Sequence, residues 1–186
     1  CYALDSQLTK LETNMLEYLK ERFDAGKIDE KDCIELIENC EFDSYDEKRE
    51  AALIKHIYDH DGYLVLDIED MGNNVYSANG NEYMVLTETE ADDECFKYIE
   101  ESLWAFNPNF LSFNTDLPEE VFKVLQEKCE ASNDTILKLV EKCGNIEDLV
   151  TEAIAADGRG HFLSGYDGEE NEVFIDDECY YIYRVY

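Results

Sequence analysis

The pattern of apolar and polar residues is clearest in the stretch 81–106, which predicts a strand followed directly by a helix. Tyr83–Leu86 is a short apolar run of the kind that forms a buried strand. Thr87 and Glu90 follow with the spacing of a capping box, which marks a helix start. Apolar residues then recur at helical spacing, at Ala91, Cys95, Ile99 and Leu103.

Three helical patterns precede this stretch. Apolar residues at helical spacing predict a first helix over 6–23. Asp29 is placed to cap a second helix, whose inward face would hold Cys33, Leu36, Ile37 and Cys40. A capping box predicts a third helix over 44–60, so residues 1–60 are a candidate helical lobe.

The segment between these helices and the central stretch has the pattern of a β-meander. Tyr63–Ile68 is a strand candidate because it is mostly apolar and follows a glycine. Asn73-Asn74 and Asn79-Gly80 are both typical of tight turns between antiparallel strands. We therefore expect a three-stranded antiparallel meander over residues 63–87.

The second half of the chain returns to helical patterns and ends in β-forming residues. Helices are predicted over 118–130, 134–143 and 146–156, and strands over 161–166 and 173–185. The chain has two prolines and no linker or repeat. The sequence therefore predicts one α+β domain over 1–186, with a helical N-terminal part, the meander, further helices and C-terminal strands.

Charge changes this picture, because 46 acids against 15 bases leave a net charge of −31. An apolar fraction of 45% and 12% aromatics argue against a disordered acidic chain. The acids occur throughout the chain, and the net negative charge is densest over residues 63–116, which hold 12 acids and one base. Such a surface disfavours direct binding to nucleic acid or an anionic membrane, and it favours basic partners.

Cysteine usage and apolar run length bear on location. The seven cysteines are an odd number without a CxxC pair, so we expect reduced thiols in a cytosolic protein. No signal peptide and no apolar run near 18 residues is present. We expect neither secretion nor membrane insertion.

Candidate catalytic or metal-binding chemistry is sparse. His56 and His60 lie four residues apart on a predicted helix, a spacing that suits a shared metal, but a third ligand is lacking nearby. The glycine-rich loop around 157–172 combines Arg159, His161, Tyr166 and Asp167. Ser164 in this loop lacks the GxSxG context of a nucleophile. We expect no cofactor, and we interpret the loop as structural in preference to catalytic.

Acidic helix faces are the feature with the clearest physical route to a function. Carboxylates three or four residues apart on a helix are about 5–6 Å apart, a spacing similar to that of phosphates along a DNA strand. Two groups of carboxylates are candidate partner-binding patches. The denser group contains Glu88, Glu90, Asp92, Asp93, Glu94, Glu100 and Glu101. The second contains Glu30, Glu35, Glu38 and Glu41. Solubility is the alternative reading of both groups.

Three strings of the sequence carry a resemblance to known proteins: YMVLTETEADDECFKYIEESLWAFNPNFL, AADGRGHFLSGYDGEENEV and YYIYRVY. They resemble a family of small acidic proteins of bacteriophages and mobile elements, over roughly residues 63–186. The resemblance implies a phage or mobile-element origin and a location in the cytoplasm of a bacterial host cell, and it carries no assigned chemistry. DNA mimicry of the antirestriction or anti-CRISPR kind is an analogy of charge alone.

These observations leave three functional hypotheses. The leading one is a non-enzymatic inhibitor that mimics DNA and occupies the basic nucleic-acid channel of a host defence protein. The second is a phage adaptor that binds its partner through apolar surface, with the acidity serving solubility. The third is a small metal-dependent hydrolase that uses the histidine pair or the glycine-rich loop. The sequence leaves the oligomeric state open.

Overall fold

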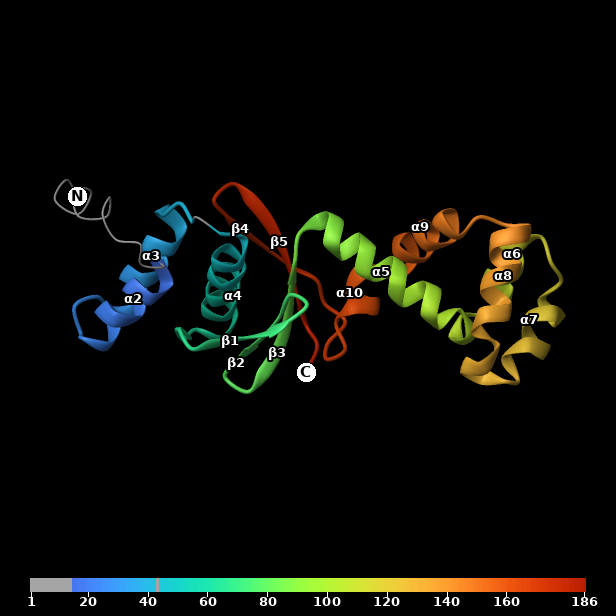
Figure 1. Ribbon diagram of the computed structural model, residues 1–186, viewed down its shortest axis with the longest axis horizontal. Coiled ribbons are helices and arrows are strands. Elements are labelled where there is room, and N and C mark those ends of the chain that lie inside the picture. The colour runs from blue at the N-terminus through green and yellow to red at the C-terminus, as the bar shows by residue number, and fades with distance from the viewer. Residues whose placement is uncertain (1–14, 43) are drawn as a thin grey trace. The chain divides into compact units, whose positions relative to one another are not determined.

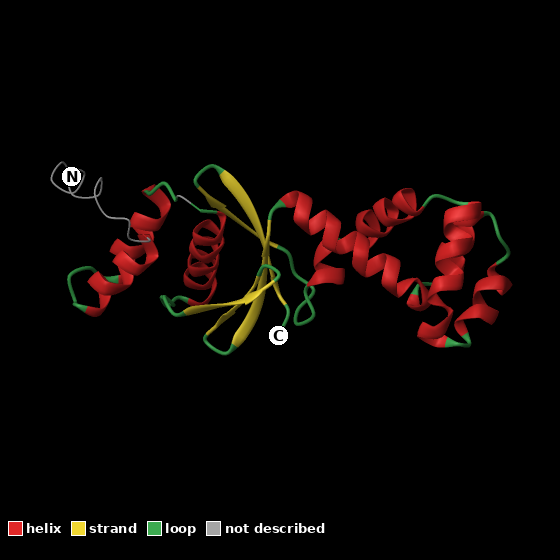
Figure 2. Ribbon diagram, in the orientation of Figure 1, coloured by secondary structure: helices red, strands yellow, loops and turns green. Residues whose placement is uncertain are grey.

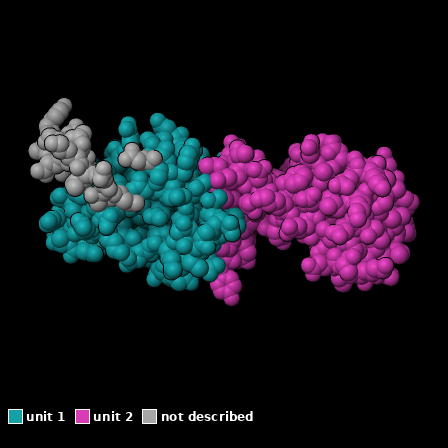
Figure 3. Space-filling model, viewed as in Figure 1, with its two compact units in different colours: residues 1–85, 171–182 teal, residues 86–170, 183–186 magenta. Residues whose placement is uncertain are grey.

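The computed structural model describes residues 15–42 and 44–186, and its fold is α+β, as predicted (Figure 2). The described chain divides into two compact units, coloured separately in Figure 3. Unit 1 contains the described part of residues 1–85 together with 171–182. Unit 2 contains residues 86–170 and 183–186. A single domain over the whole chain stays a prediction.

Unit 1 contains three described helices, α2 (Met15–Asp24), α3 (Glu30–Asn39) and α4 (Tyr45–Asp61). The part of the first predicted helix before Met15 lies outside the described residues. Helix α3 begins as expected, because the Asp29 carboxylate accepts the backbone N–H of Asp32 at 2.9 Å. Helix α4 begins with the Glu47 N–H donating to Ser44 Oγ at 3.1 Å. Local capping chemistry therefore fixes where both helices begin.

A five-stranded sheet with the order β1-β2-β3-β5-β4 completes this unit, and α4 covers one of its faces (Figure 1). Its strands are β1 (Ile68–Gly72), β2 (Val75–Ala78), β3 (Asn81–Leu86), β4 (Asn171–Ile175) and β5 (Glu178–Arg184). Both predicted turns are confirmed, because Asn73, Asn74, Asn79 and Gly80 all have positive φ angles. Asp176 and Asp177 form the same kind of turn between β4 and β5.

The predicted strand over 63–68 is wrong, because the first strand of the meander is Ile68–Gly72. The two-residue turn at Asn73-Asn74 pairs Gly72 with Val75, so the residues directly before the turn must form the strand. Leu64–Leu66 are half-buried and pack on the core without strand pairing. Their apolar character reflects this packing.

The core of unit 1 lies between α4 and the inward face of the sheet. Leu53 and Ile57 of α4 are almost fully buried, as are Tyr76, Tyr180 and Ile182 of the sheet. Alternate residues of β2, β3, β4 and β5 belong to this core, as expected from the two-residue period of a strand. Lys48 pairs with Asp176 at 3.0 Å and so ties α4 to the β4–β5 turn.

Unit 2 is mainly helical, and α5 runs through its centre with α9 and α10 packed against it (Figure 1). Its elements are α5 (Glu88–Ser102), η1 (Leu103–Ala105), α6 (Pro108–Thr115), α7 (Glu119–Gln126), η2 (Cys129–Ser132), α8 (Asn133–Cys143), α9 (Ile146–Asp157) and α10 (Arg159–Leu163). The expected helices over 134–143 and 146–156 are confirmed as α8 and α9. The helix expected over 118–130 is confirmed as α7, which ends earlier.

Two segments differ from the sequence-based expectation. The predicted strand over 161–166 is wrong, because residues 159–163 form the short helix α10. Residues 162–164 are all buried, so the period-two burial of a half-covered strand is absent there. Residues 108–115, for which no element was expected, form α6, which Asn107 caps by accepting the Asn109 N–H at 2.9 Å.

Cysteine exposure leads to a first prediction. The six described cysteines are free; Cys33 and Cys95 are fully buried, whereas Cys129 and Cys143 are exposed. Burial raises the pKa of Cys33 to about 11 and that of Cys95 to about 12. We expect a thiol reagent to modify Cys129 and Cys143 first, followed by Cys33 and Cys95 only in denaturant. Peptide mapping checks this order, and rapid labelling of Cys95 in native buffer would contradict it.

Candidate functional site

Helix α5 carries the denser predicted acidic patch. A capping box begins this helix, and buried residues define its inward face. The Thr87 N–H donates a hydrogen bond to Glu90 Oε2 at 2.9 Å, so the Glu90 side chain is part of the capping box at the N-terminus of α5. Ala91, Cys95 and Ile99 are fully buried and define the inward face. The opposite face of α5 therefore points to solvent.

The seven carboxylates of this patch do not all have the same surroundings. Asp92 pairs with Arg159 at 3.0 Å, and Glu94 pairs with Lys97 at 2.5 Å. Glu88 and Asp92 are exposed, although helical geometry places them on the same side of α5 as its buried residues. Asp93 and Glu101 are exposed, Glu100 is half-buried beside them, and among the described residues no cation pairs with any of the three. We call these three the α5 outer carboxylates.

The second predicted patch lies in unit 1 and is less continuous than its spacing suggested. Glu30 and Glu35 are exposed on α3. Glu38 pairs with Lys55 of α4 at 2.7 Å, so part of its charge is neutralised within the unit. Glu41 lies beyond the last residue of α3. This group is therefore a weaker candidate for a continuous acidic surface.

Arg159 connects three parts of unit 2. Its Nε and Nη2 donate to the Glu170 carboxylate at 2.7 and 3.0 Å, and its Nη1 donates to Asp92 at 3.0 Å. The Tyr183 hydroxyl also donates to Glu170. Burial, reinforced by the carboxylates of Asp92 and Glu170 and opposed by Arg159, raises the pKa of the adjacent Cys95. Arg159 therefore forms ion pairs with two carboxylates of unit 2.

The rest of the glycine-rich loop is also held by internal contacts. Ser164 Oγ donates to Asp167 at 2.6 Å, and the Tyr166 ring lies 3.7 Å from the Arg184 guanidinium carbon. Partial burial opposes ionisation of Asp167, but hydrogen bonds from Ser164 and the Glu169 N–H outweigh it and lower its pKa. Ser164 and Asp167 therefore stabilise the loop, and His161 does not contact them to complete a catalytic triad.

The loop folds back so tightly that Gly160 has no room for a side chain. A Cβ there would lie 2.3 Å from the Gly168 carbonyl oxygen. We expect Gly160→Ala to lower the free energy of unfolding by about 2 kcal/mol, because the backbone must shift to relieve the clash. Urea denaturation followed by tryptophan fluorescence measures the change. A loss below about 0.5 kcal/mol would show that the loop yields easily.

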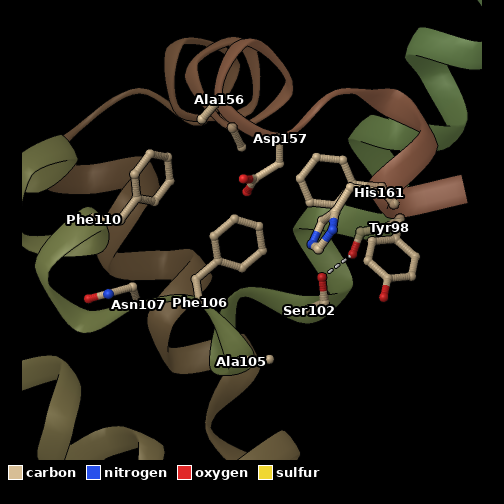
Figure 4. Close-up of a pocket in the computed structure, with 11 residues that line it drawn as sticks. Tyr98, Ser102, Ala105, Phe106, Asn107, Phe110, Ala156, Asp157 and His161 are labelled. Carbon is tan, nitrogen blue, oxygen red and sulfur yellow. Dashed lines mark hydrogen bonds between the residues drawn. The ribbon is translucent and has the colours of Figure 1, made fainter. Parts of the chain in front are cut away.

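His161 has different surroundings, because it lines a pocket of about 360 Å³ in unit 2 (Figure 4). Tyr98 of α5, Phe106, Phe110 of α6 and Phe162 of α10 supply aromatic rings to this pocket. The Phe106 and Phe162 rings are stacked, with centroids 6.3 Å apart. Asp157, the last residue of α9, points its carboxylate into the cavity (Figure 4).

Sequence reasoning identified His161 as a loop residue and missed the rest of this pocket. Its lining comes from α5, η1, α6, α9 and α10, segments that are far apart in the sequence. The density of aromatic residues between 96 and 113 was a signal, but it gave no indication of the partners across the cavity. The role of Glu170, which accepts hydrogen bonds from both Arg159 and Tyr183, was also missed.

The histidine pair does not extend to a metal site. His56 is buried and His60 exposed, with ring centroids 4.3 Å apart, and His60 Nδ1 is 2.9 Å from the His56 carbonyl oxygen. Within residues 15–42 and 44–186, no group of three or more His, Cys, Asp or Glu side chains is placed to hold a metal ion.

Two further findings bear on the chain as a whole. None of the helices in the described residues combines the length and apolar character needed to cross a lipid bilayer. Comparison of the chain with protein-family models, curated proteins and solved structures finds no match. The site must therefore be interpreted from its own geometry and charge.

Proposed function

We propose that this protein is a non-enzymatic inhibitor that binds the basic nucleic-acid-binding surface of another protein by presenting carboxylates in place of phosphates. The observation that carries the proposal is the set of α5 outer carboxylates, Asp93, Glu100 and Glu101, on a helix anchored by a buried face. Unit 2 as a whole has 21 acids and 7 bases, a net charge of −14. Its field therefore attracts cationic surfaces and repels nucleic acid.

The spacing of these carboxylates supports mimicry of a phosphate backbone. Asp93 and Glu100 are seven residues apart, which corresponds to about 10 Å along a helix axis. Three nucleotides of one DNA strand rise by about the same distance. Because α5 is capped at Thr87 and buried along one side, it presents these charges with little ordering cost on binding.

The proposed target is a host defence protein with a basic channel, such as a nuclease of the restriction or CRISPR kind. The resemblance of residues 63–186 to acidic phage proteins makes a bacterial cell the first place to search. The lysines and arginines that normally bind phosphate would bind the carboxylates, so the inhibitor and DNA would compete.

Affinity capture tests the proposal. The full chain is immobilised, a nuclease-treated bacterial lysate is passed over it, and bound proteins are eluted with a sodium chloride gradient and identified by mass spectrometry. We expect a DNA- or RNA-handling protein to elute at moderate salt, because the contacts are ionic. A captured protein that resists high salt and binds no nucleic acid would contradict mimicry and favour an adaptor that uses apolar contacts.

A further inference from the structure

The pocket of unit 2 has the composition of a site for an organic cation. Four aromatic rings, from Tyr98, Phe106, Phe110 and Phe162, line it, and ring faces carry partial negative charge. Its described lining contains Asp157 and His161 but no lysine or arginine. Aromatic faces together with a carboxylate favour a flat or alkylated cation and disfavour anionic ligands.

Asp157 is placed where its charge has no benefit for the helix that carries it. It is the last residue of α9, at the negative end of the helix dipole, where a carboxylate is locally unfavourable. It is exposed, and within the described chain no cation pairs with it. Figure 4 shows its carboxylate directed toward the rings of Phe106 and Phe110. A cationic ligand would offset this local cost.

We propose that this pocket binds the guanidinium group of an arginine side chain supplied by the basic partner. The inference rests on the proposed function, because that function requires a partner surface rich in arginine and lysine. Guanidinium is favoured over ammonium because it is planar, stacks on aromatic rings and pairs with a carboxylate through two hydrogen bonds. The pocket, about 360 Å³, is near the lower end of ligand sites, so it suits one side chain.

A titration of the protein with Nα-acetyl-arginine amide tests the pocket without any partner. Ala105, Ala153 and Ala156 line the cavity, so their methyl resonances report occupancy by NMR. We expect their shifts to move on titration with the arginine amide. Nα-acetyl-citrulline amide, which has a similar size but no charge, should move them at least about three-fold less at equal concentration.

Two variants test whether the Tyr98 ring and the Asp157 carboxylate bind the arginine amide. Tyr98 is 50% exposed, so Tyr98→Leu removes a ring at little structural cost. Tyr98→Leu and Asp157→Asn should each weaken binding of the arginine amide about three-fold. Asp148→Asn is the matched control, because Asp148 is an exposed carboxylate of α9 outside the pocket and its loss changes net charge equally. The unperturbed resonances of each variant verify that it is folded.

The outcomes separate this inference from the proposed function. Equal shifts with citrulline amide, or no shifts with either compound, would overturn the cation pocket and leave capture of a basic partner standing. Binding of the arginine amide, combined with unchanged partner affinity in Asp157→Asn, would overturn the partner as the source of the cation. A weakening of about three-fold in both assays, absent in Asp148→Asn, is the result that the inference requires.

Discussion

Replacing Arg159 with alanine is expected to lower the free energy of unfolding of unit 2 by about 3 kcal/mol. The Arg159 side chain is 12% exposed and pairs with both Glu170 and Asp92, so its loss leaves two carboxylates close together without their cation. Urea denaturation followed by the fluorescence of Trp104, the single tryptophan of the chain, measures unfolding of this unit.

Two comparisons make this prediction specific. Lys97→Ala removes an exposed ion pair from the same unit and should cost less than about 0.5 kcal/mol. The double variant Arg159→Met with Glu170→Leu should recover part of the loss, because it replaces the buried pair by apolar groups. Equal small losses for Arg159→Ala and Lys97→Ala would show that the Arg159 contacts do not stabilise unit 2.

Neutralising the α5 outer carboxylates together, by Asp93→Asn, Glu100→Gln and Glu101→Gln, is expected to weaken partner binding about thirty-fold. The estimate assumes about 0.7 kcal/mol for each lost charge contact. None of these three residues is buried, so the fold should be retained, and circular dichroism with the urea midpoint verifies this. Calorimetry or surface plasmon resonance with the captured partner gives the affinity.

A control of equal charge shows whether position matters. Glu127, Glu130 and Glu141 are also exposed carboxylates of unit 2, and their replacement by glutamine should weaken binding less than about three-fold. Lys97→Gln should act in the opposite direction, with affinity about twice that of the wild type, because Lys97 is a cation on the solvent face of α5. Equal losses for the two triple variants would indicate an effect of net charge alone.

Local sequence chemistry predicted where many elements begin and turn. The Thr87–Glu90 box, the Asp29 cap and the Asn79-Gly80 turn each depend on neighbouring residues, and the structure places helix starts and a hairpin turn at these positions. The apolar run at 63–68 failed as a strand signal because burial and strand pairing are separate properties. Its neighbour Ile68–Gly72 pairs because the next turn sets the register.

The candidate site was less accessible to sequence reasoning because its contacts are long-range. Arg159 and Asp92 are 67 residues apart, and no local pattern links them. The sequence showed the acidic patch on α5 as a group of closely spaced acidic residues. The buried face of the helix and the Arg159 pair reduce it to the α5 outer carboxylates. Seven similar side chains in the sequence therefore have capping, pairing and solvent-facing roles in the structure.

Displacement by duplex DNA tests the central proposal most directly. The captured partner is held on the immobilised protein at constant ionic strength, and a short duplex is added at increasing concentration. If the α5 surface occupies a nucleic-acid channel, the duplex should release the partner, at concentrations that exceed the dissociation constant of the partner for that duplex and rise with the amount of immobilised protein. A partner that stays bound at saturating DNA, or a stable ternary complex with DNA, would contradict mimicry.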